Sequence, residues 1–240
     1  MVSAEALNTY KSALKILPDN ETINNKAGEL SYKKEDYETA INYLNKAINL
    51  NPKNPVYYDN LSLAYRGMAN FPLAHEAIEK AMELDPANPV YVNNSGLIYY
   101  YQQDYQSAID LYNKAISLDD KNDIYFDNLG LVYEQMKDYK TALSIYQKAI
   151  NISNKKDNFY NLIGLMNYYQ NIMPDAIIAY KKAIEISSSN AVYWSNLSLA
   201  YMNAANYTEA EKALNKAIEL NGTEEYRKRL DEIKKLEKQS

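Results

Sequence analysis

The chain repeats one pattern with a period of 34 residues, without a gap, from Glu21 to Glu224. The clearest copies begin at Pro55, Pro89, Asp123 and Ala191. A fixed period of this length is typical of proteins built by stacking small identical units, each of which buries its apolar face against its neighbours. The repeat therefore constrains the fold more than any single residue, and it favours binding over catalysis.

Small residues recur in phase within the repeat, counting Pro55 as position one. The eighth position holds Gly28, Ser62, Gly96, Gly130, Gly164 and Ser198. The twentieth holds Ala40, Ala74, Ala108, Ala142, Ala176 and Ala210, and the twenty-seventh holds Ala47, Ala81, Ala115, Ala149, Ala183 and Ala217. The eleventh is usually tyrosine, as at Tyr65, Tyr99, Tyr133 and Tyr201. Two closely packed helices need small residues where their backbones approach, and a large residue beside them. The spacing predicts a stack of helix pairs.

These residues, in this order, resemble the tetratricopeptide repeat family over nearly the whole chain. The resemblance implies an all-α fold, a right-handed superhelical solenoid of antiparallel helix pairs whose first helices line a concave groove. One copy, residues 157–190, departs from the pattern: Asn167 replaces the expected tyrosine, and Pro174 stands at the start of the second helix.

We expect three parts: residues 1–20 as the second helix of a truncated repeat, residues 21–224 as six repeats, and residues 225–240 as a C-terminal capping helix. The first helix, predicted from Ser3 to Leu17, carries residues that match the twentieth, twenty-fourth and twenty-seventh positions: Ala6, Tyr10 and Ala13. Its partner helix is missing, so the sequence predicts a fragment of a longer repeat protein that self-associates through this edge.

The C-terminal segment has apolar residues on one face of a helix. They are Tyr226, Leu230, Ile233 and Leu236, and the rest of the segment is charged. The pattern predicts a helix that covers the open edge of the last repeat, as solenoid caps do. The alternative is a solvated extension.

Capping residues mark the predicted helix starts. Asn54-Pro55 and Asn88-Pro89 read as an N-cap followed by proline in the first turn. Short polar residues also precede the second helices: Asp36, Asn70, Asp104, Asp138 and Asn206. No segment alternates with period two, so no strand is expected.

Composition excludes several classes of function. The net charge is −5 with no basic stripe, which argues against nucleic acid. No apolar run is long enough to span a membrane, and no signal peptide is visible. The absence of cysteine excludes disulfides and thiolate metal sites. A glycan at the Asn60-Leu61-Ser62 sequon would block the groove, which favours a cytoplasmic location.

No catalytic constellation is present in the sequence. The single histidine, His75, lies beside Ala74 on a predicted second helix, where a structural or solvated role is expected. The acidic pair Asp119-Asp120 falls in a turn between repeats. No nucleophile has a base at suitable spacing. We therefore expect no enzyme activity, no cofactor and no metal site.

The sixth position suggests how a partner would be held. It is asparagine in four copies: Asn60, Asn94, Asn128 and Asn196. A column of carboxamides offers a donor and an acceptor at each step, which an extended peptide backbone needs. The alternative is that these asparagines help the helices to pack.

Apolar and aromatic residues accompany this column. The ninth position holds Leu63, Leu97, Leu131, Leu165 and Leu199, and the second adds Val56, Val90, Ile124 and Val192. Tyrosines predicted on the side of the same groove include Tyr100, Tyr101 and Tyr168. Exposed, contiguous apolar surface usually marks an interaction site. The alternative is that a neighbouring first helix covers each leucine.

The sequence thus predicts a scaffold whose apolar, asparagine-lined groove binds a peptide or protein segment with apolar side chains. In this prediction the leucines set the affinity and the asparagines set register and direction. Two alternatives remain: a targeting region of a larger enzyme such as a glycosyltransferase, and a structural module that forms homo-oligomers.

Overall fold

The computed structural model describes the backbone of residues 4–239 and the side chains of residues 6–239, and this part of the chain is all α-helical. The helices are α1 (Ala4–Ile16), α2 (Glu21–Tyr32), α3 (Tyr37–Leu50), α4 (Pro55–Gly67), α5 (Phe71–Leu84), α6 (Pro89–Tyr101), α7 (Tyr105–Leu118), α8 (Asp123–Gln135), α9 (Tyr139–Ala149), α10 (Lys156–Tyr169), α11 (Met173–Ile186), α12 (Ala191–Asn203), α13 (Tyr207–Leu220) and α14 (Glu224–Glu237). The predicted start of the first helix at Ser3 lies outside the described residues.

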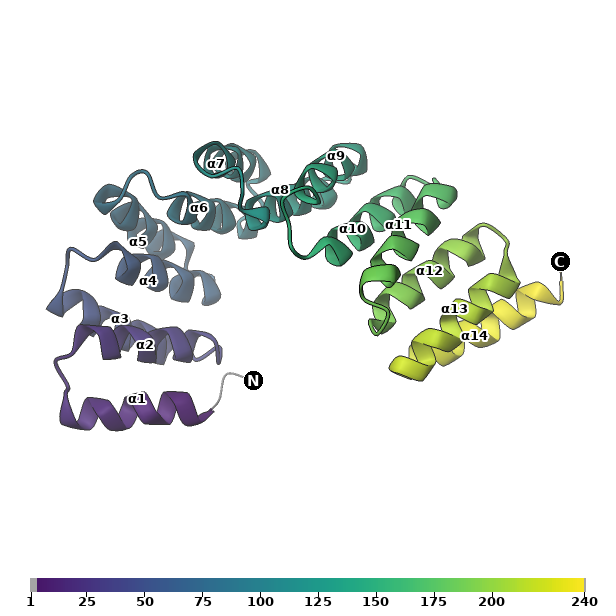
Figure 1. The fold of residues 1–240 in the computed structure, drawn as a ribbon. Helices are drawn as coiled ribbons and strands as arrows, with labels where there is room; N and C mark the ends of the chain where they lie inside the picture. Colours follow the sequence, from purple (N-terminus) through teal and green to yellow (C-terminus); the bar gives the residue numbers. More distant parts are fainter. Residues whose placement is uncertain (1–3, 240) are drawn as a thin grey trace. The chain divides into compact units, whose positions relative to one another are not determined.

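The chain forms two units, Met1–Asp120 with α1–α7 and Lys121–Ser240 with α8–α14. Each unit is a series of antiparallel helix pairs (Figure 1). In unit 1 the pairs are α2/α3, α4/α5 and α6/α7, and α1 packs against α2. In unit 2 they are α8/α9, α10/α11 and α12/α13, and α14 packs against α13. The predicted all-α class and the helix pairs are confirmed.

The predicted N-caps are confirmed for the first helices and for the second helices of the pairs. Asn54 and Asn88 each accept a backbone hydrogen bond, from Val56 and Val90, at 3.1 Å. The second-helix caps all accept in the same way: Asp36, Asn70, Asp104, Asp138 and Asn206. The irregular copy differs, because neither Lys155 before α10 nor Ile172 before α11 makes a side-chain cap bond.

At the eighth position the first helix packs closely against a side chain of the second helix, as the small residues there predict. A methyl group at Gly96, Gly130 or Gly164 would lie within 2.8, 2.3 or 2.6 Å of a tyrosine ring. These rings come from the twenty-fourth position and are almost fully buried: Tyr112, Tyr146 and Tyr180. Where serine stands at the eighth position, the twenty-fourth residue is smaller, as in the pairs Ser62 with Ile78 and Ser198 with Leu214.

The turn inside each pair has a left-handed residue that the sequence reasoning missed. The fifteenth position has a positive φ in all six copies, at Glu35, Ala69, Gln103, Lys137, Asn171 and Ala205, and none of these residues is glycine. The following backbone N–H closes the end of the first helix, as Asn70 does by donating to the Tyr65 carbonyl at 2.9 Å. A non-glycine residue in this region costs about 1–2 kcal/mol, so the closed turn must offset that strain.

The pairing of glycine with tyrosine predicts a non-additive response to substitution. Gly130→Ala places a methyl group against Tyr146, and such overpacking costs about 1–3 kcal/mol. Tyr146→Leu makes room for that group, as the serine and leucine of the last repeat do. We expect the double variant to melt at a higher temperature than the sum of the two single effects predicts. Melting temperatures from circular dichroism test this, and additive effects would contradict the close approach.

Candidate functional site

The candidate site is the side of the first helices that carries the second, fifth, sixth and ninth positions, which we call the ladder face. At 3.6 residues per turn these positions share one side of a helix. In unit 1 the ladder face runs over α2, α4 and α6, and in unit 2 over α8, α10 and α12. Each unit thus has its own ladder face.

Asparagines of the sixth position donate hydrogen bonds to the fifth position of the preceding repeat. In unit 1 the Asn60 Nδ2 atom lies 2.8 Å from Asn25 Oδ1, and Asn94 Nδ2 lies 2.8 Å from Asp59 Oδ1. In unit 2 Asn196 Nδ2 lies 2.8 Å from Oδ1 of Asn161. These amides therefore join successive first helices. Asn128 is half-buried on α8.

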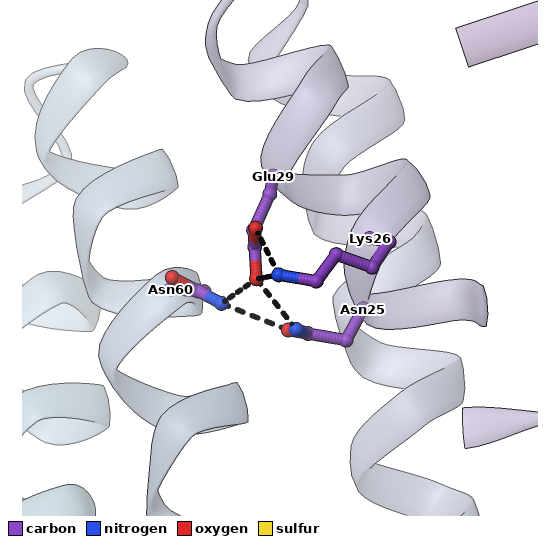
Figure 2. A network of polar contacts seen from close by, with 4 residues as sticks. All are labelled: Asn25, Lys26, Glu29 and Asn60. Carbon is purple, nitrogen blue, oxygen red and sulfur yellow. Dashed lines mark hydrogen bonds and ion pairs between the residues drawn. The ribbon is translucent and has the colours of Figure 1, made fainter. Parts of the chain in front are cut away.

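The first step of the ladder contains an ion pair as well (Figure 2). Glu29 accepts from Lys26 at 2.8 and 3.0 Å, from Asn25 at 2.8 Å and from Asn60 at 3.3 Å. The hydrogen bond to Glu29 raises the pKa of Lys26. This network explains why the ninth position is glutamate here and leucine in the other copies: the carboxylate gathers three donors from α2 and α4.

Helix α14 continues the ladder at the end of unit 2. Its Arg229 Nη1 atom donates to the Ser195 hydroxyl at 2.7 Å, across a sequence separation of 34 residues. The same guanidinium donates to Glu225 at 2.8 Å. Ile233 of α14 is fully buried, and Tyr226 and Leu230 pack against the same core. The helix thus contacts the last repeat through both polar and apolar side chains.

Two carboxyl groups of the fifth position are held away from water. Burial raises the pKa of Asp59 to about 6, although the hydrogen bond from Asn94 and the charge of Arg66 act in the opposite direction. Burial also raises the pKa of Asp127 on α8, with a further contribution from Asp123. In unit 1 the ladder therefore includes a carboxyl group that titrates near pH 6.

Apolar side chains on the ladder face differ in exposure. The ninth-position leucines are half-buried in both units: Leu63, Leu97, Leu131, Leu165 and Leu199. The second-position residues are more open, with exposed fractions of 42% for Val56, 44% for Val90, 54% for Ile124 and 50% for Val192. In unit 1 Leu63, Asn60 and Tyr32 line a hollow of about 330 Å³. The face therefore offers apolar area that no helix of its own unit covers fully.

Tyrosines at the ends of the first helices are fixed by polar and ring contacts. Tyr100 and Tyr101 pack edge to face with centroids 5.4 Å apart, and the Arg66 guanidinium lies 4.8 Å from the Tyr101 ring. Tyr101 is 56% exposed. In unit 2 Asn203 Nδ2 donates to the Tyr168 hydroxyl at 2.8 Å. The rings are thus oriented at the edge of the ladder face.

The fifth position was missed as a functional column by the sequence reasoning, although its signal was present. It is a short polar residue in every copy: Asn25, Asp59, Asn93, Asp127, Asn161 and Ser195. A polar residue that recurs beside another polar column indicates a pair of hydrogen-bonding partners. The periodicity alone does not say which repeat supplies the partner.

The single histidine, His75, makes contacts that are consistent with a structural role. His75 Nε2 is hydrogen-bonded to Gln102 Oε1 at 2.7 Å, and the imidazole ring packs 4.5 Å from the Tyr99 ring. Within residues 4–239 no group of three acidic or imidazole side chains is arranged to hold a metal ion. None of the helices described in this range is long and apolar enough to cross a membrane.

The chain belongs to the tetratricopeptide repeat family. Family profiles described as tetratricopeptide repeat match residues 22–54, 56–88, 90–155 and 191–224. Residues 156–190 lie outside these matches, and this is the copy that carries Asn167 and Pro174. No curated protein sequence matches the chain.

Solved structures with the same fold are similar to most of the chain. YrrB, described as a TPR protein with an unusual peptide-binding site, has a TM-score of 0.61 at 22% identity, covering 79% of this chain and 97% of YrrB. PilF of Pseudomonas aeruginosa has a TM-score of 0.69 at 21% identity, covering 88% and 97%. Yeast Tom70 has a TM-score of 0.70 at 18% identity, covering 86% of this chain and 44% of Tom70. These likenesses show the fold.

The buried carboxyl group predicts a specific pH dependence of stability. Burial raises the pKa of Asp59 in the folded state, so the folded chain binds this proton more tightly than the unfolded chain. The resulting stabilisation is complete below the unfolded pKa and is lost as the pH rises through about 6. Asp59→Asn keeps the Oδ1 acceptor for Asn94, and it reproduces the asparagine found at Asn25 and Asn161.

We therefore expect Asp59→Asn to stabilise the chain at pH 7 by roughly 1–3 kcal/mol, given 1.36 kcal/mol per pKa unit. The gain should shrink as the pH falls toward 4. Melting temperatures at the two pH values measure it, with Asp120→Asn in an exposed turn as the control. A gain that does not change with pH would show that the carboxyl charge is not the cause.

Proposed function

We propose that this chain is a protein-interaction scaffold whose ladder face binds a peptide or protein segment with apolar side chains. The observation that carries the proposal is the exposure of the second-position residues, which are 42–54% exposed beside half-buried leucines. An apolar strip of this kind on a polar chain favours an interaction surface. The family and the YrrB description, a peptide-binding site, support the same class of function.

The hydrogen bonds of the ladder assign different tasks to the two ends of the Asn60 and Asn196 carboxamides. Asn60 and Asn196 use their Nδ2 atoms to hold the preceding repeat. Their Oδ1 atoms have no hydrogen-bond partner among residues 6–239, whose side chains the structure describes. An amide fixed at one end presents its oxygen in a defined direction, and a carbonyl oxygen accepts from a backbone N–H. The asparagines are therefore suited to orient an extended segment.

Apolar contacts supply most of the binding free energy in this proposal. A net hydrogen bond contributes about 0.5–1.5 kcal/mol, whereas association costs about 4–15 kcal/mol. Covering a fully exposed valine or leucine contributes about 1.5–3 kcal/mol, so half-exposed residues contribute about half of that. Several residues at the second and ninth positions must therefore be covered together, which requires a segment that crosses more than one repeat.

The test uses a peptide selected on the chain from a random peptide library and labelled with fluorescein. We expect Leu63→Asp with Leu97→Asp to weaken binding at least about tenfold, because a charge replaces apolar contact at two successive steps. Fluorescence polarisation measures the dissociation constant, and circular dichroism verifies that helicity is unchanged.

A second pair of variants keeps the test valid if the leucine variant unfolds. Val56 and Val90 are 42% and 44% exposed, and Leu50 and Leu118, outside the ladder face, are 41% and 44% exposed. Aspartate at both valines should weaken binding, whereas aspartate at Leu50 and Leu118 should not. Equal effects of the two pairs would show that the selected peptide binds elsewhere or responds only to added charge.

A further inference from the structure

A furrow lies on the side of α4 that faces away from the ladder face. The fourth, seventh and eleventh positions of a first helix lie opposite its second, sixth and ninth positions at 3.6 residues per turn. In unit 1 these positions are Tyr58, Leu61 and Tyr65, and together with α3 and α5 they line a furrow of about 440 Å³. The furrow is thus separate from the surface assigned to the proposed function.

An alanine at the twenty-third position of the repeat lines the furrow. Ala77 of α5 lies in the furrow beside Tyr58 in unit 1. In unit 2 the equivalent pairs, Tyr160 with Ala179 and Trp194 with Ala213, line furrows of about 330 and 290 Å³. Each of these three rings is half-buried and therefore keeps an accessible part.

In unit 2 the chain's own lysines lie over one tyrosine ring in each furrow. The Lys182 Nζ atom is 5.3 Å from the centroid of Tyr160, and Lys181 Nζ is 5.6 Å from that of Tyr201. These distances are those of cation–π contacts. Two furrows of unit 2 therefore each hold an ammonium group above an aromatic ring.

In unit 1 no lysine among the described residues makes a cation–π contact with a ring of the equivalent furrow, although Lys80 lines it. The equivalent of Lys182 is Lys80, which instead pairs with Glu83 at 2.7 Å. The equivalent of Lys181 is the neutral Asn45. Two further carboxylates, Glu76 and Glu79, line the furrow, so the acidic groups outnumber the single cation.

We propose that the furrow between α3, α4 and α5 binds a lysine side chain from a basic segment of a partner protein. The ammonium lies over the ring of Tyr65, as Lys181 lies over the equivalent Tyr201 ring of unit 2. Glu76 and Glu79 balance its charge from the rim. Charge complementarity selects a basic occupant, and the furrows of unit 2 supply the geometry.

The test measures the binding of fluorescein-labelled octalysine to the whole chain by fluorescence polarisation at physiological salt. Asn45→Lys places an ammonium where Lys181 lies in unit 2, so it should occupy the Tyr65 ring and weaken octalysine binding about fivefold or more. Asn151→Lys adds the same charge in an exposed loop of unit 2 and is the matched control.

A second pair of variants tests the rim without changing the rings. Glu76→Gln with Glu79→Gln should weaken binding more than Glu38→Gln with Glu232→Gln, which removes the same charge from exposed sites. Octalysine should also fail to displace a peptide bound to the ladder face. The proposal is overturned if octalysine does not bind, or if either furrow variant binds as its control does, since net charge alone then explains the attraction.

Discussion

The hydrogen bond from the sixth position of one repeat to the fifth position of the repeat before it is the interaction on which the ladder face depends. It joins residues 35 apart in sequence, as in Asn60 to Asn25 and Asn94 to Asp59. A buried polar group without a partner costs about 1–3 kcal/mol, so each buried amide favours the register that supplies its partner. The small residues at the eighth position let the helices of a pair approach, and the ladder aligns one pair with the next.

The ladder hydrogen bonds change how the asparagines of the sixth position contribute to recognition. An asparagine with both ends free would have to lose side-chain rotamers when a ligand bound, whereas Asn60 and Asn196 are already held by their Nδ2 atoms. Preorganisation of this kind lowers the entropic cost of association. The apolar residues beside the column then determine how tightly a segment binds, and the fixed carbonyl oxygens determine how it lies.

Much of the fold could be predicted from the sequence because its determinants are local or periodic. Caps such as Asn54 and Asp36 act within three residues, and Gly130 recurs in phase with its equivalents. The partner of Asn60 could not be assigned, since a bond across 35 residues depends on how two pairs stack. The left-handed turn at Ala69 was missed because its usual marker, glycine, is absent.

The exposure of the site residues also could not be predicted from the sequence. Periodicity places Leu63 and Val56 on the same side of α4, but it does not predict that the leucine is half-buried and the valine 42% exposed. The uncapped start of α11 at Ile172 is likewise specific to the copy that departs from the repeat.

The side-chain amide resonances of Asn60, Asn94 and Asn196 test the central claim most directly. If their Nδ2 atoms bridge successive repeats, the amide protons should exchange slowly with water in the free chain, and their chemical shifts should differ from those of an unfolded chain. Binding of a ladder-face peptide should shift them further while they stay protected. Rapid exchange with water and chemical shifts like those of an unfolded chain would show that the asparagines are not fixed, and would contradict the account.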